Sequence, residues 1–392
     1  MQSSCALPML IGVQMSILGG ETMTTKKVSR RQLFSGALAA GAAGLAASAM
    51  PRAYADHHMS GGASSLPRQV GLPNVWGEDF LFQWSPPENV ERDLTPGNST
   101  LRLASSNSNF GRLLNVEGAD YDSQFKAWKK AGWTACEAGS NQWMSRRMPD
   151  SEKRELKAAL AENDMVFYGI HCGGNIIGPG KVGEDSRRHI VETIHEAADM
   201  GCKLVLTHAG GLHPNRNVAH PQNWSKDAWE QSVAAMKSIC RDTAGIDIQI
   251  PIEAVNSESV NNPWAHKRLI DDVGDPRVGV GLDVTNFVYP GFAFRMTELL
   301  NTTFDLLGDH VTYIHAKDLV WDEMLAGLNW SVQGTGLVDY ETMLTRASRL
   351  TGPEIYVLIE FLDQDEKYVQ AQRNIRSIAD NLGVKVYGTQ EA

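Results

Sequence analysis

The chain lacks several features that mark common protein classes. Its 392 residues include five cysteines, no C-x-x-C pair, and neither a G-x-G-x-x-G nor a Walker loop. The scarcity of cysteine argues against a disulfide framework or a cysteine-ligated zinc site, and the missing loops argue against the usual nucleotide-binding folds. We therefore expect buried free thiols at the four widely spaced cysteines beyond residue 55, which are Cys136, Cys172, Cys202 and Cys240.

Basic residues are also in deficit. Lys and Arg number 36 against 46 Asp and Glu, which gives a formal net charge of −10. Without the first 55 residues, 31 basic and 45 acidic residues remain, a net charge of −14. Because such a surface repels phosphate backbones, we expect no nucleic-acid partner.

The first 55 residues differ in composition from the rest. The stretch "TTKKVSRRQLF" carries the pair Arg30 and Arg31, an Ala/Gly-rich apolar run follows, and Ala53-Tyr54-Ala55 has the A-x-A form of a cleavage site. This arrangement resembles a twin-arginine export signal and predicts a periplasmic protein. The apolar run is short for a membrane span, so we expect no stable membrane insertion after cleavage.

The remainder of the chain has a repeating organisation. Residues 56–100 are rich in Gly, Ser, Pro and His, and we interpret them as a linker and an irregular N-terminal arm. From residue 101, strand-like runs alternate with amphipathic helical segments. Eight strand-like runs can be counted: "LRLAS", "WTACEAG", "MVFYGIHC", "KLVLTHAG", "IQIPIEAV", "VGVGLDV", "VTYIHAKD" and "IYVLIEFL".

This alternation predicts an α/β fold, a single-domain (β/α)8 TIM barrel over residues 101–385, with a short C-terminal tail at 386–392. A doubly wound open sheet is the competing fold, but no nucleotide-binding loop supports it. Polar residues close seven of the strand-like runs, and in a closed barrel those strand ends meet at one mouth. They are Glu137, His171, His208, Glu253, Asp283, His315 and Glu360.

Four of these residues suggest a metal site. Glu253, Asp283, His315 and Glu360 combine three carboxylates with one imidazole, and three anions share a pocket only when a cation compensates them. We expect one divalent ion, Mn²⁺ in the first place, with Mg²⁺, Co²⁺ or Zn²⁺ as alternatives. The competing interpretation is that each acid caps a helix or pairs with an arginine.

The motifs "IPIEAVN", "GLDVTNF", "YIHAKD", "VLIEF" and "GTGLVDYETM" resemble those of the sugar isomerase/epimerase superfamily, the xylose-isomerase-like TIM barrels that include ketose 3-epimerases and inosose dehydratases. The resemblance covers about Leu101 to Gly383. It implies that the four residues bind one metal ion. It also implies that Glu253 and Glu360 face each other across the substrate, one removing a proton and the other returning it through a metal-stabilised enediolate.

Two positions depart from the pattern of the superfamily. Asn286 stands where relatives often carry His, which argues against a multinuclear metal centre. Trp321 stands where epimerases often carry Arg, which puts the familiar contact to substrate oxygens in doubt.

Several further residues are candidates for substrate binding, each with a structural alternative. His171 and His208 would bind sugar hydroxyls or be satisfied buried imidazoles, and Glu137 would bind a hydroxyl or form a salt bridge within the barrel. Asn286 is a further candidate, and Asp318 would orient Lys317 or His315 or cap a helix. Indole rings would stack on a sugar or pack in loops: Trp143, Trp264, Trp321 and Trp330.

The sequence thus predicts an exported, divalent-metal-dependent isomerase or epimerase. An unphosphorylated sugar or keto-sugar is the expected substrate, because phosphorylated sugars are chiefly intracellular. The main alternative is a lyase or dehydratase on the same barrel, such as one that catalyses β-elimination from a 3-keto-glycoside. An endonuclease-like phosphodiesterase and a non-catalytic sugar-binding module are remoter alternatives, and homo-oligomerisation is left open.

Overall fold

The computed structural model describes residues 92–388, apart from 106–108, 146–147 and 290–291. The predicted export signal, the predicted linker up to residue 91 and the last four residues of the predicted tail lie outside the described residues. Within the described part, no helix combines the length and the apolar character that crossing a bilayer requires.

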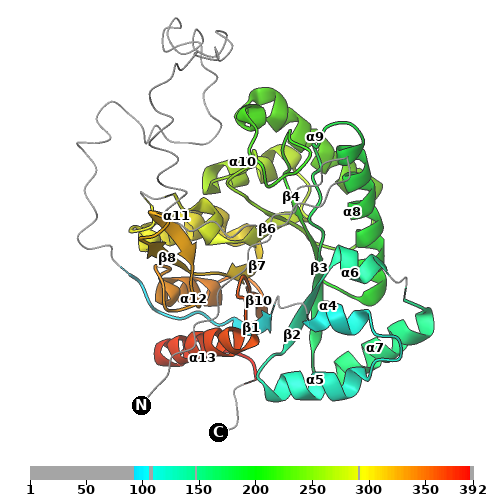
Figure 1. Ribbon diagram of the computed structural model, residues 1–392, viewed down its shortest axis with the longest axis vertical. Helices are drawn as coiled ribbons and strands as arrows, with labels where there is room; N and C mark the ends of the chain where they lie inside the picture. The colour runs from blue at the N-terminus through cyan, green and yellow to red at the C-terminus, as the bar shows by residue number, and fades with distance from the viewer. Residues whose placement is uncertain (1–91, 106–108, 146–147, 290–291, 389–392) are drawn as a thin grey trace, which may run out of the picture. The chain divides into compact units, whose positions relative to one another are not determined.

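Eight parallel strands close into a barrel, which confirms the predicted TIM-barrel fold (Figure 1). Each predicted strand-like run overlaps one barrel strand, and β1 pairs with β10 along its whole length to close the sheet. The barrel strands are β1 (Thr100–Ser105), β2 (Ala135–Gly139), β3 (Val166–His171), β4 (Leu204–His208), β5 (Ile250–Glu253), β6 (Val278–Leu282), β7 (Val311–Ala316) and β10 (Glu354–Ile359).

Helices follow the strands and cover the outside of the barrel (Figure 1). Their apolar stripes face the sheet; in α9, for example, Trp229, Met236 and Cys240 are buried. The α-helices are α4 (Asn109–Leu114), α5 (Tyr121–Lys130), α6 (Ser140–Ser145), α7 (Asp150–Glu162), α8 (Lys181–Met200), α9 (Lys226–Asp242), α10 (Pro263–Val273), α11 (Met296–Leu307), α12 (Tyr340–Ser348) and α13 (Asp365–Leu382). The 3-10 turns are η1 (Pro221–Trp224), η2 (Val284–Phe287) and η3 (Gly308–His310).

The barrel interior has its own small core, distinct from the core beneath the helices. The rings of Tyr168 and Tyr356 stack there with centroids 4.6 Å apart, and Tyr313 lies 5.7 Å from Tyr168. A Cβ on Gly281 would lie 2.9 Å from the ring of Tyr313 and 2.7 Å from Leu206. The small residues of the β6 run therefore leave room for the tyrosine rings that fill the barrel.

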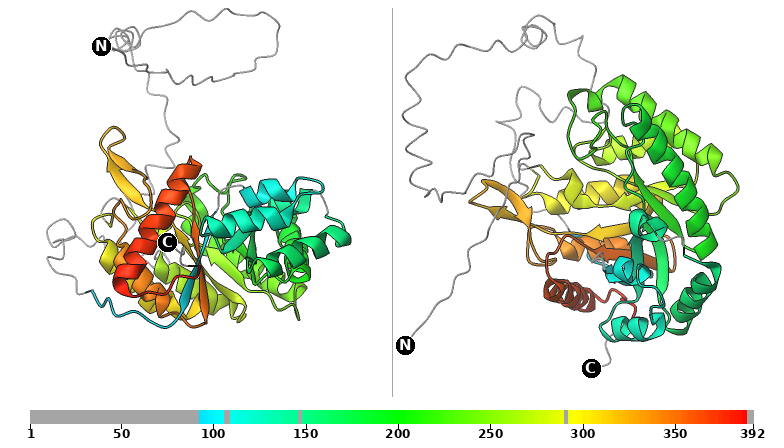
Figure 2. Two further views of the ribbon diagram at one scale, coloured as in Figure 1. Left: turned by 90° about the horizontal axis from the view of Figure 1, so that it is seen from below. Right: turned by 45° about the vertical axis from the view of Figure 1, so that its right-hand side comes forward.

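The four described cysteines are all buried and unpaired, as predicted. One element was not predicted from the sequence: β8 (Leu319–Asp322) and β9 (Gly327–Trp330) form an antiparallel hairpin after β7, drawn in orange in Figure 2. At the other end of the sheet, Val386 bridges to Leu101, so part of the predicted tail packs beside β1.

Candidate active site at the barrel mouth

Strand alternation turns the polar residues at the strand ends into the barrel. Tyr313 and Leu358 belong to the interior core, so His315 and Glu360, two residues further along, point to the same side. Asp283 follows the inward-facing Gly281 by the same interval. Side chains from separate βα units therefore meet at the carboxyl-terminal end of the barrel.

Four of these side chains form one compact group, Glu253, Asp283, His315 and Glu360, which we call the four-residue cluster. One ligand atom from each lies within 4.8 Å of those of the other three. All four residues are at most 7% exposed. The fold thus brings together the residues predicted to bind metal, at the spacing that sharing one ion requires.

Neighbouring side chains orient two of the carboxylates. Thr285 donates hydrogen bonds from its backbone N–H (3.0 Å) and its hydroxyl (2.6 Å) to Oδ1 of Asp283, which leaves Oδ2 facing the cluster. Asn286 donates from Nδ2 to Oε1 of Glu253 at 2.9 Å. Asn286, predicted to bind substrate, therefore lies at the site and holds a cluster carboxylate in place.

Lys317 is a fifth member of the site. Its Nζ lies 2.5 Å from Oδ2 of Asp283, 2.7 Å from Oε1 of Glu360 and 3.7 Å from Oε1 of Glu253. The side chain is only 4% exposed. The ammonium group therefore neutralises part of the negative charge that the three carboxylates concentrate in a buried space.

The ionisation of the cluster follows from burial and from these cations. Burial favours the neutral acids, but His315 and Lys317 hold the pKa values of Glu253 and Glu360 below their usual range. At Asp283 burial dominates, and the pKa is raised. Burial opposes the charge on His315, yet the two glutamates raise its pKa well above the usual value.

A divalent cation suits this donor set. Both ring nitrogens of His315 and Oε1 of Glu360 are buried without a hydrogen bond of normal geometry to any described residue, although Nδ1 and Oε1 are 2.8 Å apart. A divalent ion together with the Lys317 ammonium would balance three carboxylates, provided that His315 were a neutral ligand. Glu253, Asp283, His315 and Glu360 are the residues that would hold the ion.

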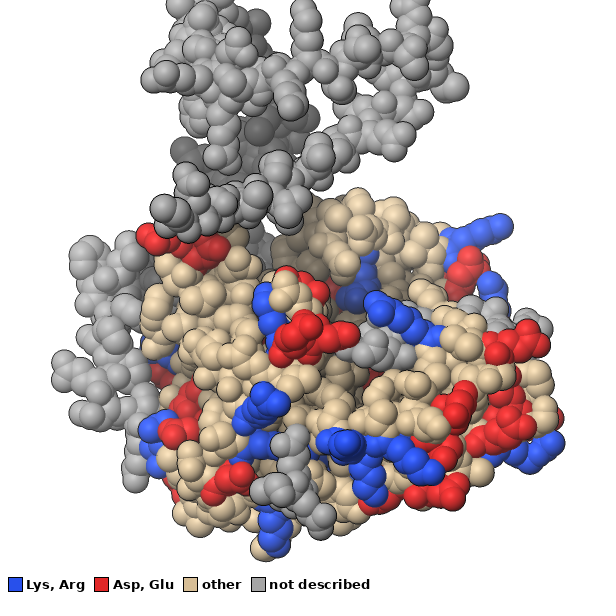
Figure 3. Space-filling view, turned by 60° about the horizontal axis from the view of Figure 1, so that its bottom comes forward, with Lys and Arg blue, Asp and Glu red and all other residues tan. Residues whose placement is uncertain are grey.

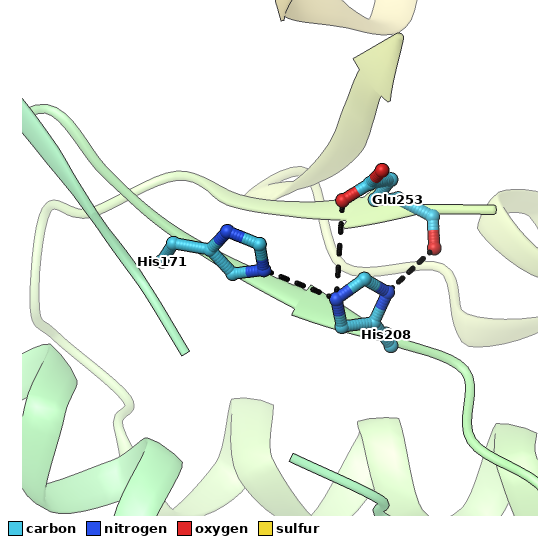
Figure 4. Close-up of side chains that lie close together, drawn as sticks. All are labelled: His171, His208 and Glu253. Atoms are coloured by element: carbon cyan, nitrogen blue, oxygen red, sulfur yellow. Dashed lines mark hydrogen bonds and ion pairs between the residues drawn. The ribbon is translucent and has the colours of Figure 1, made fainter. Parts of the chain in front are cut away.

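Two histidines extend the site toward β3 and β4 (Figure 4). Nδ1 of His208 lies 3.2 Å from the backbone carbonyl of Glu253, which can only accept, so Nδ1 carries the proton. Nε2 of His208 is then the acceptor for Nε2–H of His171, 3.2 Å away. This assignment leaves Nδ1 of His171 as a hydrogen-bond acceptor.

Burial keeps both imidazoles neutral, since it lowers the pKa of His171 to about 4 and that of His208 well below the usual value. His171, His208 and Glu253 also form a second group whose ligand atoms lie within 4.8 Å of one another. This group too could hold an ion, so the spacing of the residues alone does not limit the site to one metal.

A β-bulge explains how β3 supplies both a core residue and a site residue. Cys136 pairs with Phe167 and Glu137 with Gly169, so Tyr168 has no partner in the register. The extra residue shifts the alternation, and Tyr168 and His171, three positions apart, both reach the interior. Simple alternation would have placed them on opposite faces.

Glu137 lies beside this pair, on β2. It accepts a hydrogen bond from the Tyr168 hydroxyl at 2.9 Å, and its Oε1 is 3.9 Å from Nδ1 of His171. Burial raises the pKa of Glu137 to about 7. The carboxyl group is therefore poised to exchange a proton near neutral pH.

Exposed aromatic rings lie near the four-residue cluster. Nζ of Lys317 is 4.3 Å from the ring centre of Phe361 and 5.7 Å from that of Trp330. Those two rings are 4.8 Å apart, and Trp321 lies on the same hairpin as Trp330. Phe361 has a left-handed backbone with φ +63°, an unfavourable conformation that places this side chain next to Glu360.

The prediction that Trp143 stacks on a sugar is wrong. Trp143 is 5% exposed and packs against Phe167 with ring centroids 5.3 Å apart, in the core beneath the helices. Its position after a strand was correct, but its short helix turns the ring toward the sheet. Trp264 is half-buried at the start of α10.

Asp318 organises the hairpin and the loop that follows it. Its carboxylate accepts hydrogen bonds from four backbone N–H groups, and a Cβ on Gly336 would lie 2.4 Å from Oδ1. Asp318 therefore shapes the loop and does not contact His315 through a hydrogen bond among the described residues. The donors are Leu319, Gly334, Gly336 and Val338.

The sequence did not indicate that Lys317, Phe361 and Arg216 lie at or beside the site. Lys317 follows His315 by two residues, so strand alternation could have placed it on the same face. Phe361 directly follows a predicted ligand, but nothing in the sequence indicated its backbone conformation.

Comparison with known proteins agrees with this architecture. A family model described as a xylose isomerase-like TIM barrel matches residues 125–378. The uncharacterised protein YfiH of Bacillus subtilis (strain 168) is 27% identical over an alignment 213 residues long, which covers 49% of this chain and 64% of that protein. The match therefore spans less than two thirds of that relative.

Solved structures show the same fold at low identity. A xylose isomerase-like TIM barrel protein from Mycobacterium smegmatis in complex with magnesium has a TM-score of 0.53 at 15% identity, covering 72% of this chain and 96% of that one. D-Psicose 3-epimerase with D-tagatose, from Clostridium cellulolyticum H10, has a TM-score of 0.52 at 13% identity, and the match covers 68% of this chain and 94% of that one. The probable 3-DHS dehydratase AsbF of Bacillus anthracis has a TM-score of 0.54 at 13% identity, and the match covers 72% of this chain and 98% of that one.

Proposed function

Because this chain belongs to the xylose isomerase-like TIM barrel family, we propose that it is a divalent-metal-dependent isomerase or epimerase of an unphosphorylated sugar or keto-sugar. The observation that carries the proposal is the four-residue cluster, whose buried ligand atoms lie within 4.8 Å of one another at the barrel mouth. Mn²⁺ is the proposed ion because the donor set is rich in carboxylate oxygen.

The two glutamates are the proposed acid and base. When bound, the ion would polarise the substrate carbonyl and acidify the neighbouring carbon. Glu253 on β5 and Glu360 at the end of β10 are separated by β6 and β7 in the barrel, so they approach the cluster from different sides. One removes the proton from the α-carbon and the other returns it, while Asn286 fixes the carboxylate of Glu253.

Other residues of the site supply the contacts that a polyhydroxylated substrate needs. Nδ1 of His171 accepts a hydrogen bond from a hydroxyl, and Glu137 exchanges hydrogen bonds with another. The exposed rings of Trp330 and Phe361, with Trp321 on the same hairpin, offer flat apolar surface to the C–H face of a sugar. These assignments, like export to the periplasm through the Arg30–Arg31 signal, are parts of the proposal.

A dehydratase or lyase on the same barrel is the second candidate, and Glu137 favours it. Elimination needs an acid that protonates the departing hydroxyl or alkoxide, and a carboxyl with a pKa of about 7 holds its proton near neutral pH. Trp321, in place of an epimerase-type arginine, points in the same direction. Both reactions share proton abstraction beside a carbonyl.

Product analysis by NMR in deuterated water separates the two candidates. Solvent deuterium at one carbon, with all hydroxyl groups retained, identifies an isomerase or epimerase. An unsaturated product or a released aglycone identifies a lyase. Absence of deuterium exchange across a panel of free and 3-oxidised sugars, with the Mn²⁺-loaded protein, would contradict both.

Phosphodiester cleavage is disfavoured by charge. The net charge is −10, and on the face drawn in Figure 3 acidic and basic side chains are interspersed. A nucleic-acid backbone binds where basic groups gather along its path. A nuclease assay on DNA with abasic sites should therefore show no cleavage.

A further inference from the structure

A partly buried ion pair beside the two histidines has no part in the proposed mechanism. Arg216, in the segment between β4 and η1, places Nη1 3.2 Å from Oε1 of Glu258 and donates from Nε to the carbonyl of Gly173 at 3.2 Å. Glu258 is 0% exposed, and its other oxygen accepts the N–H of Gly210 at 2.6 Å. Two of the three guanidinium nitrogens are thus fixed in position by the protein.

The third guanidinium nitrogen of Arg216, Nη2, is not fixed by the protein in this way. Nη2 donates to no acceptor among the described residues, and the side chain is 20% exposed. The place where a Cβ on Gly173 would stand lies 3.6 Å from Nη2 and 3.8 Å from Nε2 of His171. Gly173 is exposed and carries no side chain, so the position that its Cβ would take, which we call the recess, is not filled by this residue.

The recess adjoins the proposed active site. His171 forms one wall, and from it hydrogen bonds run through His208 to the backbone of Glu253. The positive charge of Arg216 also contributes, after burial, to the lowered pKa of His208. Only His171 and His208 would therefore lie between a ligand in the recess and Glu253 of the four-residue cluster along this path.

The charge of Arg216 is only partly compensated. Full burial raises the pKa of Glu258 to about 7 even though Arg216 lies beside it. Near neutral pH the carboxyl group is therefore incompletely ionised, and the guanidinium retains attraction for an anion. One free N–H₂ group of a guanidinium suits the single negative charge of a carboxylate. A site for the more highly charged phosphate group would be expected to contain several basic side chains.

We propose that Arg216 and Gly173 form an anion subsite beside the neutral His171, and that the substrate is a sugar acid, whose carboxylate pairs with Nη2 of Arg216 while its carbonyl end lies at the four-residue cluster. The placement of the carbonyl end at the four-residue cluster rests on the proposed function. The subsite itself can be tested without turnover.

Binding of three probes to the Mn²⁺-loaded full chain, measured by isothermal titration calorimetry, tests the subsite. The probes are D-glucuronate, D-glucose and D-glucose 6-phosphate. D-Glucuronate should bind more tightly than the other two. Arg216→Gln should weaken its binding about 10- to 100-fold, the range of a charge-assisted hydrogen bond, and leave D-glucose unaffected. Arg216→Lys should give an intermediate affinity, because the charge is kept and the planar geometry is lost.

Gly173→Ala provides a second variant that keeps the arginine. The added methyl group would stand at ordinary contact distance from both walls, so the protein should fold and the recess should be filled. D-Glucuronate binding should fall by about 10-fold or more while Mn²⁺ binding is unchanged. Arg188→Gln, which breaks an exposed i,i+3 pair with Asp185, is the matched control and should change neither.

The competing explanation is that Arg216 merely fastens its loop to Gly173 and Glu258. In that case Arg216→Gln would lower the melting temperature and weaken all three probes alike, which would overturn the proposal, as would preferential binding of the 6-phosphate. Failure of the isomerase proposal has a different signature: no deuterium exchange into any sugar, with the selective loss of D-glucuronate binding still observed.

Discussion

The position of Lys317 makes a quantitative prediction about metal binding. Its ammonium group contacts Asp283 and Glu360 at 2.5 and 2.7 Å, the same oxygens that would coordinate a metal ion. An ion held by those oxygens would displace Nζ from direct contact with them. The ammonium group would stay close enough to count in the charge balance, because the rings of Phe361 and Trp330 offer a cation-binding surface beside the cluster.

The expected magnitudes follow from charge and distance. Two opposite charges 2.7 Å apart attract by about 6 kcal/mol at an effective dielectric constant of about 20, and desolvation of the ammonium group offsets much of this. Removing one partner of a buried ion pair costs about 3–5 kcal/mol. With an unfolding entropy of about 2.1 cal/mol/K per residue over a barrel of about 290 residues, that loss lowers Tm by about 5–8 °C.

Lys317→Gln therefore has two opposite effects. In EDTA the melting temperature should fall by that amount, because three buried carboxylates lose their compensating charge. Mn²⁺ should bind about 30-fold more tightly, which corresponds to about 2 kcal/mol of relieved competition. Calorimetric titration with Mn²⁺ and thermal melts with and without EDTA measure both quantities.

The matched control is Lys226→Gln, which breaks a pair with Glu230 in which the lysine side chain is 78% exposed. It should change stability by less than about 0.5 kcal/mol and leave Mn²⁺ affinity unchanged. If Lys317→Gln behaves like this control in both assays, the ammonium group does not share the cluster and the reasoning fails.

Four further outcomes are expected. Glu360→Gln should lower turnover by about 10²-fold or more, measured as deuterium exchange. The pKa of Glu137 is about 7 in the folded protein and about 4.5 in the unfolded chain, so the free energy of unfolding falls by about 3 kcal/mol as the pH rises from 4.5 to 7. Glu137→Gln should therefore gain stability relative to wild type between pH 5 and pH 8 in urea melts. Gly336→Ala should destabilise the barrel by about 1–3 kcal/mol, because its Cβ would clash with Asp318. Replacing Arg30 and Arg31 by Lys should abolish export in cell fractionation.

Each of these outcomes has a clear opposite. Unchanged exchange in Glu360→Gln would remove that residue from the proposed acid–base pair. An equal stability difference at pH 5 and pH 8 would show that Glu137 titrates normally. A melting temperature of Gly336→Ala equal to that of wild type would show that the loop around Asp318 shifts to accommodate the added methyl group. Periplasmic protein after the Arg30 and Arg31 substitutions would refute the twin-arginine prediction.

Three features of the site depend on tertiary packing and could not be predicted from the sequence. Strand alternation alone predicts that Tyr168 and His171 face opposite sides, and only the bulge in β3 brings both inward. Trp143 follows a strand as predicted, but the direction of its ring depends on how α6 packs against β3. Glu258 and Arg216 are 42 residues apart, and their pairing arises only because adjacent barrel strands bring their loops together.

The sequence by itself determined the repeating βα pattern, and with it the closed barrel and the convergence of Glu253, Asp283, His315 and Glu360. Apolar alternation has a fixed period, and a polar residue after each buried run marks the end of a strand. Only the tertiary structure decided that Lys317 lies among those carboxylates and that Arg216 stands beside His171. Such contacts depend on distances between separate loops and side chains, which no local period of the chain encodes.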